Sequence, residues 1–224
     1  MRTIAVISQK GGSGKTTTLL NLAVAAHEDK KSVVVVDLDA QASATQWHRE
    51  RADKSPHVQP THPAGLADLL KTCEGQGVEW ILIDTAASTD RTASEAVEVA
   101  DLVLVTCRPS VVDLRAITNT IRLCRIRSME PHVLLTQVEP QGTLQAEARS
   151  TLAGLDVHVL KNVLGRRAAF HHSMIDGRAA LEYEPQGKAA NEVRAVYREL
   201  CQLVGKSSRQ HDGKPAAPRV RADA

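Results

Sequence analysis

The sequence predicts a single doubly wound α/β domain, with a mainly parallel sheet and helices on both faces. Short runs of apolar, often β-branched residues alternate along the chain with longer segments of helical periodicity. The runs are apolar on consecutive residues, as expected for strands that are buried on both faces. The chain has 224 residues, which suits one well-buried core, and shows neither an internal repeat nor a second domain.

The individual elements follow from these patterns. The predicted strands comprise residues 3–8, 32–36, 80–83, 102–106, 132–136 and 157–160. Helical periodicity is clearest in residues 15–28, 113–129 and 188–204. Residues 52–63 are interrupted by His and Pro, and we expect them to form a surface loop.

Polar residues end or follow three of the predicted strands. Ser8 is the last residue of the first, Asp37 follows the second and Asp84 follows the third. Because ligands bind at the carboxyl ends of the strands in open parallel sheets, we expect these three side chains to share one site.

The segment between the first strand and the first helix is a glycine-rich phosphate loop of the Walker-A kind. Glycines let the backbone wrap closely around an anion, and successive N–H groups then point at the phosphates. In this pattern Lys15 reaches the β- and γ-phosphates of ATP, and the Thr16 hydroxyl ligates Mg²⁺. The predicted nucleotide-binding residues are Gly11, Gly12, Ser13, Gly14, Lys15, Thr16 and Thr17. The alternative is a strand-to-helix turn with no ligand, which the Gly-Lys-Thr ending disfavours.

The loop departs from the ordinary pattern, because Gln9 replaces the first glycine and Lys10 follows it. The resulting Lys-Gly-Gly-x-Gly-Lys-Thr-Thr motif resembles the deviant Walker-A family, which includes the ParA and MinD partition ATPases, the nitrogenase iron protein and the arsenite-pump ATPases. The resemblance implies that Lys10 reaches across a homodimer to the nucleotide of the other subunit. A cation placed there would act like an arginine finger supplied in trans. A merely solvated lysine is the alternative.

Two acidic motifs strengthen the resemblance. Residues 37–43 look like the switch I segment of the family, which implies that Asp39 orients or activates the attacking water and that Asp37 supports the Mg²⁺ shell or the loop itself. Residues 81–86 match the Walker-B strand, in which Asp84 would hold Mg²⁺ through water. For all three aspartates the alternative is capping of the turn or helix that follows.

The resemblance extends over residues 2–204 and favours the short ParA type, often called type Ib. Residues 107–114 resemble the family segment Pro-Ser-x-x-Asp-Leu, and residues 177–192 resemble the ending of short ParA proteins. The first strand begins at residue 3, so we expect no N-terminal helix-turn-helix domain. A MinD-type membrane helix is not expected after residue 204, and the cysteines do not match the cluster motifs of the nitrogenase protein.

Composition adds a few expectations. Aromatic residues make up only 2% of the chain, which argues against binding of single-stranded nucleic acid by base stacking. The four cysteines form no Cys-x-x-Cys pair, and we expect packed, reduced thiols in a cytoplasmic protein. Residues 1–204 are predicted to be the ATPase domain, and residues 205–224 a basic, disordered tail.

By resemblance, such a protein dimerises around ATP, binds double-stranded DNA without sequence preference, and is released when a ParB-like or cargo-adaptor protein stimulates hydrolysis. It would be nucleoid-associated in the cytoplasm, with plasmid, chromosome or protein cargo and no membrane partner. DNA binding needs Lys and Arg on one face. The candidates are Arg166, Arg167, Arg178, Lys188, Arg194 and Arg198. For each the alternative is a solvated surface charge. Two other functions stay open: a P-loop metabolic enzyme, and a DNA-bound regulator that ATP only switches.

Overall fold

The computed structural model describes residues 1–87 and 90–211 and confirms the predicted fold class. A seven-stranded sheet has the order β3-β2-β4-β1-β5-β6-β7, and each neighbouring pair of these strands is parallel. The strands are β1 (Arg2–Ile7), β2 (Val33–Asp37), β3 (His57–Pro60), β4 (Trp80–Asp84), β5 (Leu102–Cys107), β6 (His132–Leu135) and β7 (His158–Val159).

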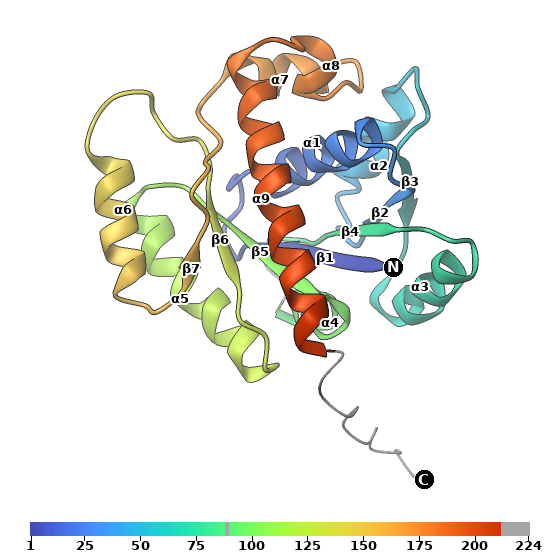
Figure 1. Ribbon diagram of the computed structural model, residues 1–224, viewed down its shortest axis with the longest axis horizontal. Coiled ribbons are helices and arrows are strands. Elements are labelled where there is room, and N and C mark those ends of the chain that lie inside the picture. Colours follow the sequence, from blue (N-terminus) through green and yellow to red (C-terminus); the bar gives the residue numbers. More distant parts are fainter. Residues whose placement is uncertain (88–89, 212–224) are drawn as a thin grey trace, which may run out of the picture.

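Helices connect the strands and cover both faces of the sheet (Figure 1). They are α1 (Lys15–Glu28), α2 (Ser43–Glu50), the 3₁₀ turn η1 (Pro63–Gly65), α3 (Leu66–Gly75), α4 (Asp90–Val99), α5 (Val111–Ile126), α6 (Leu144–Ala153), α7 (Ala168–Met174), α8 (Ala180–Tyr183) and α9 (Lys188–His211).

Alternating residues of each strand divide the core into two clusters. In β1, Ile4 and Val6 belong to a cluster with apolar residues of α1, α8 and α9, and Ala5 and Ile7 belong to one with residues of α4, α5 and α6. Side chains of neighbouring residues in a strand point to opposite faces, which explains the division. In Figure 1, α9 crosses the sheet on the same face as α1.

The predicted loop at residues 52–63 was wrong in part, because it contains the edge strand β3. Only Val58 of this strand is well buried, and the strand pairs with β2 alone. Pro60 is tolerated because a proline at a sheet edge leaves no inner hydrogen bond unmade. A single buried side chain gives too weak a periodic signal to distinguish such a strand from a loop.

The predicted disordered tail was also wrong at its start. Helix α9 continues past Val204 to His211. A helix that is already held by packing propagates until a breaker occurs, and the first proline beyond it is Pro215. Residues 212–224, the rest of the predicted tail, lie outside the described residues. None of the described helices combines the length and apolar character needed to cross a bilayer.

The expectation of packed, reduced thiols agrees with the structure. All four cysteines are free thiols, and Cys73, Cys107 and Cys124 are buried.

A histidine at the β6–β7 edge makes stability depend on pH. His132 lies against His158, with ring centroids 4.9 Å apart, and its Nδ1 atom has no hydrogen-bond partner among the described residues. Burial, together with His158, lowers the pKa of His132 from 6.5 to about 4. Between pH 6.5 and pH 4, His132 is therefore protonated in the unfolded chain but neutral in the folded chain. The free energy of unfolding that the neutral His132 contributes is lost as pH falls toward 4.

We predict that His132→Gln removes this dependence. The free energy of unfolding of the wild type, relative to the variant, should fall by about 1–3 kcal/mol between pH 7.5 and pH 4.5. Urea denaturation at both pH values measures the difference. An equal gap between the two proteins at both pH values would contradict the assignment.

Candidate nucleotide-binding site

The glycine-rich loop joins the carboxyl end of β1 to the start of α1, at the centre of the sheet. Gly12 has φ +71° and Gly14 has φ +84°. Both values lie in the left-handed region, which glycine adopts without steric cost. Gly14 is the N-cap of α1 and offers no side chain to the free N–H groups of the first turn. The helix therefore begins with open N–H donors, as an anion site requires.

Side chains from two neighbouring strands hold the loop in shape. Thr136 Oγ1 donates to the Ser13 carbonyl over 2.7 Å, and Gln137 Nε2 donates to the Gly12 carbonyl over 2.7 Å. The hydroxyls of Ser13 and Thr106 lie 3.0 Å apart. The sequence prediction did not include these anchors. The polar residues at the strand ends, Thr106 and Thr136, were the signal that could have found two of the three anchors.

Lys15 is only 7% exposed although it carries a charge. Burial lowers the pKa of its ammonium, and the carboxylates of Asp84 and Asp39 oppose this shift. The structure thus brings together three of the predicted residues from β4, α1 and the loop after β2. A cation held in this position is suited to an anionic ligand on the loop.

Asp84 is fully buried at the end of β4. Its Oδ2 accepts a hydrogen bond of 2.7 Å from the Thr16 hydroxyl, whereas Oδ1 has no partner among the described residues. Burial raises the pKa of Asp84 to about 7, and the Thr16 hydroxyl opposes this shift. An unpaired buried carboxylate oxygen beside a hydroxyl is a donor set that fits Mg²⁺.

In the part of the chain that is described, no group of three or more His, Cys, Asp or Glu side chains could hold a metal. A Mg²⁺ ion at Thr16 and Asp84 would need its other ligands from phosphates and water. That division of ligands is usual for Mg²⁺ at phosphate loops.

Asp37 supports the loop after β2. Its Oδ1 accepts from the Asp39 N–H over 3.1 Å, and its Oδ2 accepts from the N–H and hydroxyl of Thr45 over 2.9 and 2.7 Å. Both carboxylate oxygens therefore already accept hydrogen bonds. This geometry favours support of the loop by Asp37 over a contribution of Asp37 to the Mg²⁺ shell. Asp39 is half-buried, and its Oδ1 accepts from the Gln41 N–H over 2.9 Å.

Two further cations lie near the loop. Lys10 is half-buried, and no ion pair within residues 1–87 and 90–211 involves its ammonium. A Cβ on Gly12 would lie 3.9 Å from an Arg108 guanidinium nitrogen, so Arg108 approaches the loop. Asp113 holds Arg108 through a 3.1 Å ion pair and is itself hydrogen-bonded to Ser110. Arg108 belongs to a segment that the sequence resemblance covers but was not predicted as a site residue.

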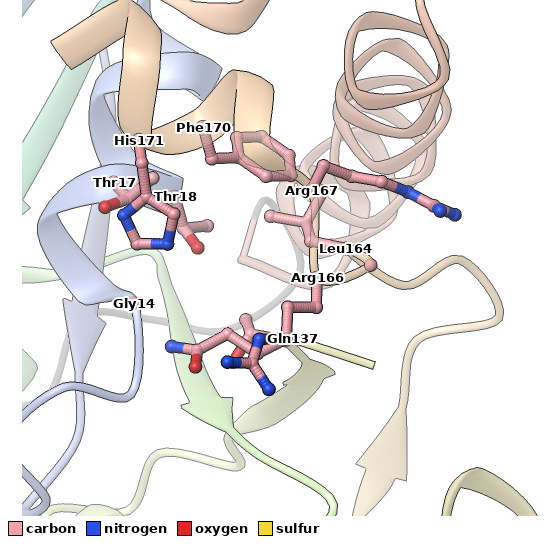
Figure 2. A pocket seen from close by; sticks show the side chains of 11 residues that line it. Gly14, Thr17, Thr18, Gln137, Leu164, Arg166, Arg167, Phe170 and His171 are labelled. Carbon is pink, nitrogen blue, oxygen red and sulfur yellow. The ribbon is translucent and has the colours of Figure 1, made fainter. Parts of the chain in front are cut away.

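A pocket opens beside the loop (Figure 2). Gly14, Thr17 and Thr18 form its wall on the loop side, and Gln137 and Arg166 lie on the other side of the opening. Its remaining lining comes from Thr136, Leu164, Gly165, Arg167, Phe170 and His171. An apolar recess with a few polar groups at its rim suits a flat heterocyclic ring.

The six basic residues that were predicted to bind DNA fall at different places. Arg166 and Arg167 line the pocket, Arg178 lies between α7 and α8, and the other three are on α9. Four of them are in ion pairs, which weakens their attraction for phosphates. These pairs are Arg166–Glu139, Arg167–Glu192, Arg178–Asp176 and Arg194–Glu28. Lys188 and Arg198 are exposed and have no ion pair among the described residues.

Comparison with known proteins agrees with this geometry. The model of a family described as the CobQ/CobB/MinD/ParA nucleotide binding domain matches residues 4–180. The maintenance of carboxysome distribution protein A of Gloeobacter kilaueensis is 33% identical over 215 residues, covering 93% of this chain and 96% of that protein. The chromosome-partitioning ATPase Soj of Thermus thermophilus is 24% identical, covering 91% of this chain and 97% of that protein.

Among solved structures, the chain resembles the septum site-determining protein MinD of Pyrococcus horikoshii, which was determined in complex with Mg-ADP. The TM-score is 0.74 at 20% identity, covering 92% of this chain and 98% of that chain. This similarity supports the fold.

We predict that two glycines of the loop differ in their tolerance of a side chain. Gly14→Ala forces a left-handed alanine and should lower the free energy of unfolding by about 1–2 kcal/mol. Gly11 has no positive φ, and a Cβ there would meet nothing within 4 Å, so Gly11→Ala is the matched control and should be neutral for stability. Chemical denaturation of both variants without ligand measures this. Equal losses would contradict the described loop conformation.

Proposed function

The chain belongs to the CobQ/CobB/MinD/ParA nucleotide-binding family, and we propose that it is an ATPase that positions a cargo inside the cell. The observation that carries the proposal is the group formed by Lys15, Thr16 and Asp84 beneath an open phosphate loop. We assign this activity to residues 1–204.

ATP and Mg²⁺ fit the site as it stands. The N–H groups of residues 11–17 would bind the phosphates, and Lys15 would neutralise the β- and γ-phosphates. Thr16 and Asp84 would hold Mg²⁺, which withdraws charge from the phosphates during transfer. The adjoining pocket would take the nucleoside, with Phe170 as an apolar wall and Gln137 as a polar partner.

Hydrolysis needs an oriented water and a positive charge at the transferred phosphoryl group. We assign the first task to Asp39, which follows β2 and whose negative charge raises the pKa of Lys15. We assign the second to Lys10 of a partner subunit, because no carboxylate of its own subunit pairs with it among the described residues. The site is then complete only in a homodimer formed around two nucleotides.

The exposed cations of α9, Lys188 and Arg198, support non-specific binding of double-stranded DNA by the dimer. A ParB-like or cargo-adaptor protein would stimulate hydrolysis and release the dimer, so that the protein acts in the cytoplasm at the nucleoid. The relative with 33% identity is named for carboxysome distribution, which favours a protein assembly over a plasmid or chromosome as the cargo.

We predict that Lys10→Ala separates nucleotide binding from turnover. The variant should bind ATP like the wild type, because Lys15 remains, and should hydrolyse it at least about 100-fold more slowly, because the transition-state charge loses a counter-ion. Lys15→Ala is the comparison and should lose binding itself. Equilibrium nucleotide binding and phosphate release measure the two properties.

A mixture of Lys10→Ala with Asp39→Ala sharpens this test. In a mixed dimer, the site that keeps Asp39 also receives an intact Lys10 from the partner, so part of the activity should return. Normal turnover by Lys10→Ala alone would refute the role in trans.

We also predict salt-dependent binding of a random-sequence duplex that requires ATP. Arg198→Ala should weaken it and reduce the slope of log K against log salt by about one. Arg91→Ala is the matched control, because Arg91 is an exposed arginine on α4, on the opposite face of the sheet. Fluorescence anisotropy in ATP, ADP and no nucleotide measures binding. Binding that is equal in all three states would favour a DNA-bound regulator, and no binding with substrate-stimulated turnover would favour a metabolic enzyme.

A further inference from the structure

A short helix connects the nucleotide site to the segment between α7 and α8. We propose that Trp47 and Arg51, at the end of α2, transmit the state of the bound nucleotide to the surface that carries Arg178 and Tyr183. This inference rests on the proposed function, because it assumes that ATP binds next to Asp37 and Asp39.

The start of α2 is fixed to the nucleotide site. The Asp37 carboxylate accepts hydrogen bonds of 2.9 and 2.7 Å from the N–H and hydroxyl of Thr45, in the first turn of the helix. The same carboxylate accepts from the N–H of Asp39 over 3.1 Å. A change at Asp39 when a γ-phosphate arrives therefore acts directly on the position of α2. The helix is eight residues long, short enough to shift as one body.

The other end of α2 is fixed to the α7–α8 segment. Arg51 is only 3% exposed, and its guanidinium donates to the Gly177 carbonyl over 2.8 Å and to Glu182 over 2.7 Å. It also lies 4.7 Å from the centroid of the Trp47 ring. Trp47 Nε1 in turn donates to the Arg178 carbonyl over 3.1 Å. Arg51 and Trp47 thus bind the carbonyl groups of two consecutive residues in the segment between α7 and α8.

The backbones of the two segments lie in direct contact. A Cβ on Gly177 would lie 2.5 Å from the backbone nitrogen of Arg51, so the two backbones already touch. Arg51 is buried, and a buried charge is strongly penalised when its partner is removed. Displacement of α2 should therefore carry Gly177 and Glu182 with it rather than break the Arg51 interactions.

The surface on the far side of this contact is exposed and suited to a large partner. The Arg178 guanidinium lies 5.0 Å from the centroid of the Tyr183 ring, and it pairs with Asp176 over 2.7 Å. Tyr183 is 38% exposed and Ile175 is 77% exposed. A movement of the Gly177–Arg178 backbone would change whether the Arg178 guanidinium pairs with Asp176 or with a phosphate of bound DNA. The affinity for duplex DNA would then depend on which nucleotide is bound.

Trp47 gives a direct readout, because the chain has only two tryptophans. In a Trp80→Phe protein, the emission of Trp47 should differ between the ATP–Mg²⁺ and ADP–Mg²⁺ states, since its indole environment moves with α2. Equilibrium dialysis of labelled nucleotide establishes in the same samples that both states are saturated. Identical emission in the two saturated states would overturn the inference.

Glu182→Gln tests the transmission itself. The variant keeps the shape of the side chain and an oxygen that can accept from Arg51, but it removes the charge. We expect unchanged ATP affinity, whereas the ratio of duplex affinities in ATP and ADP should fall by about fivefold or more. Glu98→Gln is the matched control, because Glu98 forms an exposed ion pair with Arg127 on a different part of the surface. An unchanged ratio in folded Glu182→Gln would also overturn the inference.

The two experiments separate this inference from the proposed function. If the wild type binds no DNA in any nucleotide state, the DNA part of the proposed function fails. The Trp47 measurement needs no DNA and then decides the inference alone.

Discussion

The site depends on a carboxylate that is kept out of water. Asp84 ends a strand that is buried on both faces, and one of its oxygens has no hydrogen-bond partner among the described residues. A charge in that position is stable only with a cation nearby. Without a ligand, Lys15 supplies part of the positive charge that Asp84 needs. The Thr16 hydroxyl donates a hydrogen bond to the other oxygen of Asp84. A metal ion, bound together with the phosphates of a nucleotide, would supply the rest of the positive charge.

The sheet explains why these groups meet. β4 and β1 are parallel neighbours, and β1 leads directly into the loop, so the end of β4 lies beneath the start of α1. Apolar runs have a local signature, which is why the fold class could be predicted from the sequence. Strand-end aspartates and the glycine loop also have local signatures, which is why residues 10–17, 37, 39 and 84 could be named as candidates. The family match shows the fold and the family, and the roles of the individual site residues are proposals of this account.

Features that depend on contacts between distant residues could not be predicted. Gln137 reaches the loop only because β6 lies beside β5, and nothing in its local sequence marks that contact. The acidic partner of Arg167 lies 25 residues away and reduces its value as a DNA contact. The Arg51–Glu182 pair joins residues 131 positions apart. Lone charges in a sequence do not reveal their partners, so counts of Lys and Arg exaggerate the positive surface.

The central claim is that ATP completes the site by bringing two subunits together. Sedimentation velocity of Asp39→Ala with Mg²⁺ and either ATP or ADP tests it most directly, because the proposed role of Asp39 predicts that this variant does not consume the ATP during the run. The account predicts a dimer with ATP and a monomer with ADP. A monomer at saturating ATP would contradict it, because Lys10 would then have no second nucleotide to reach.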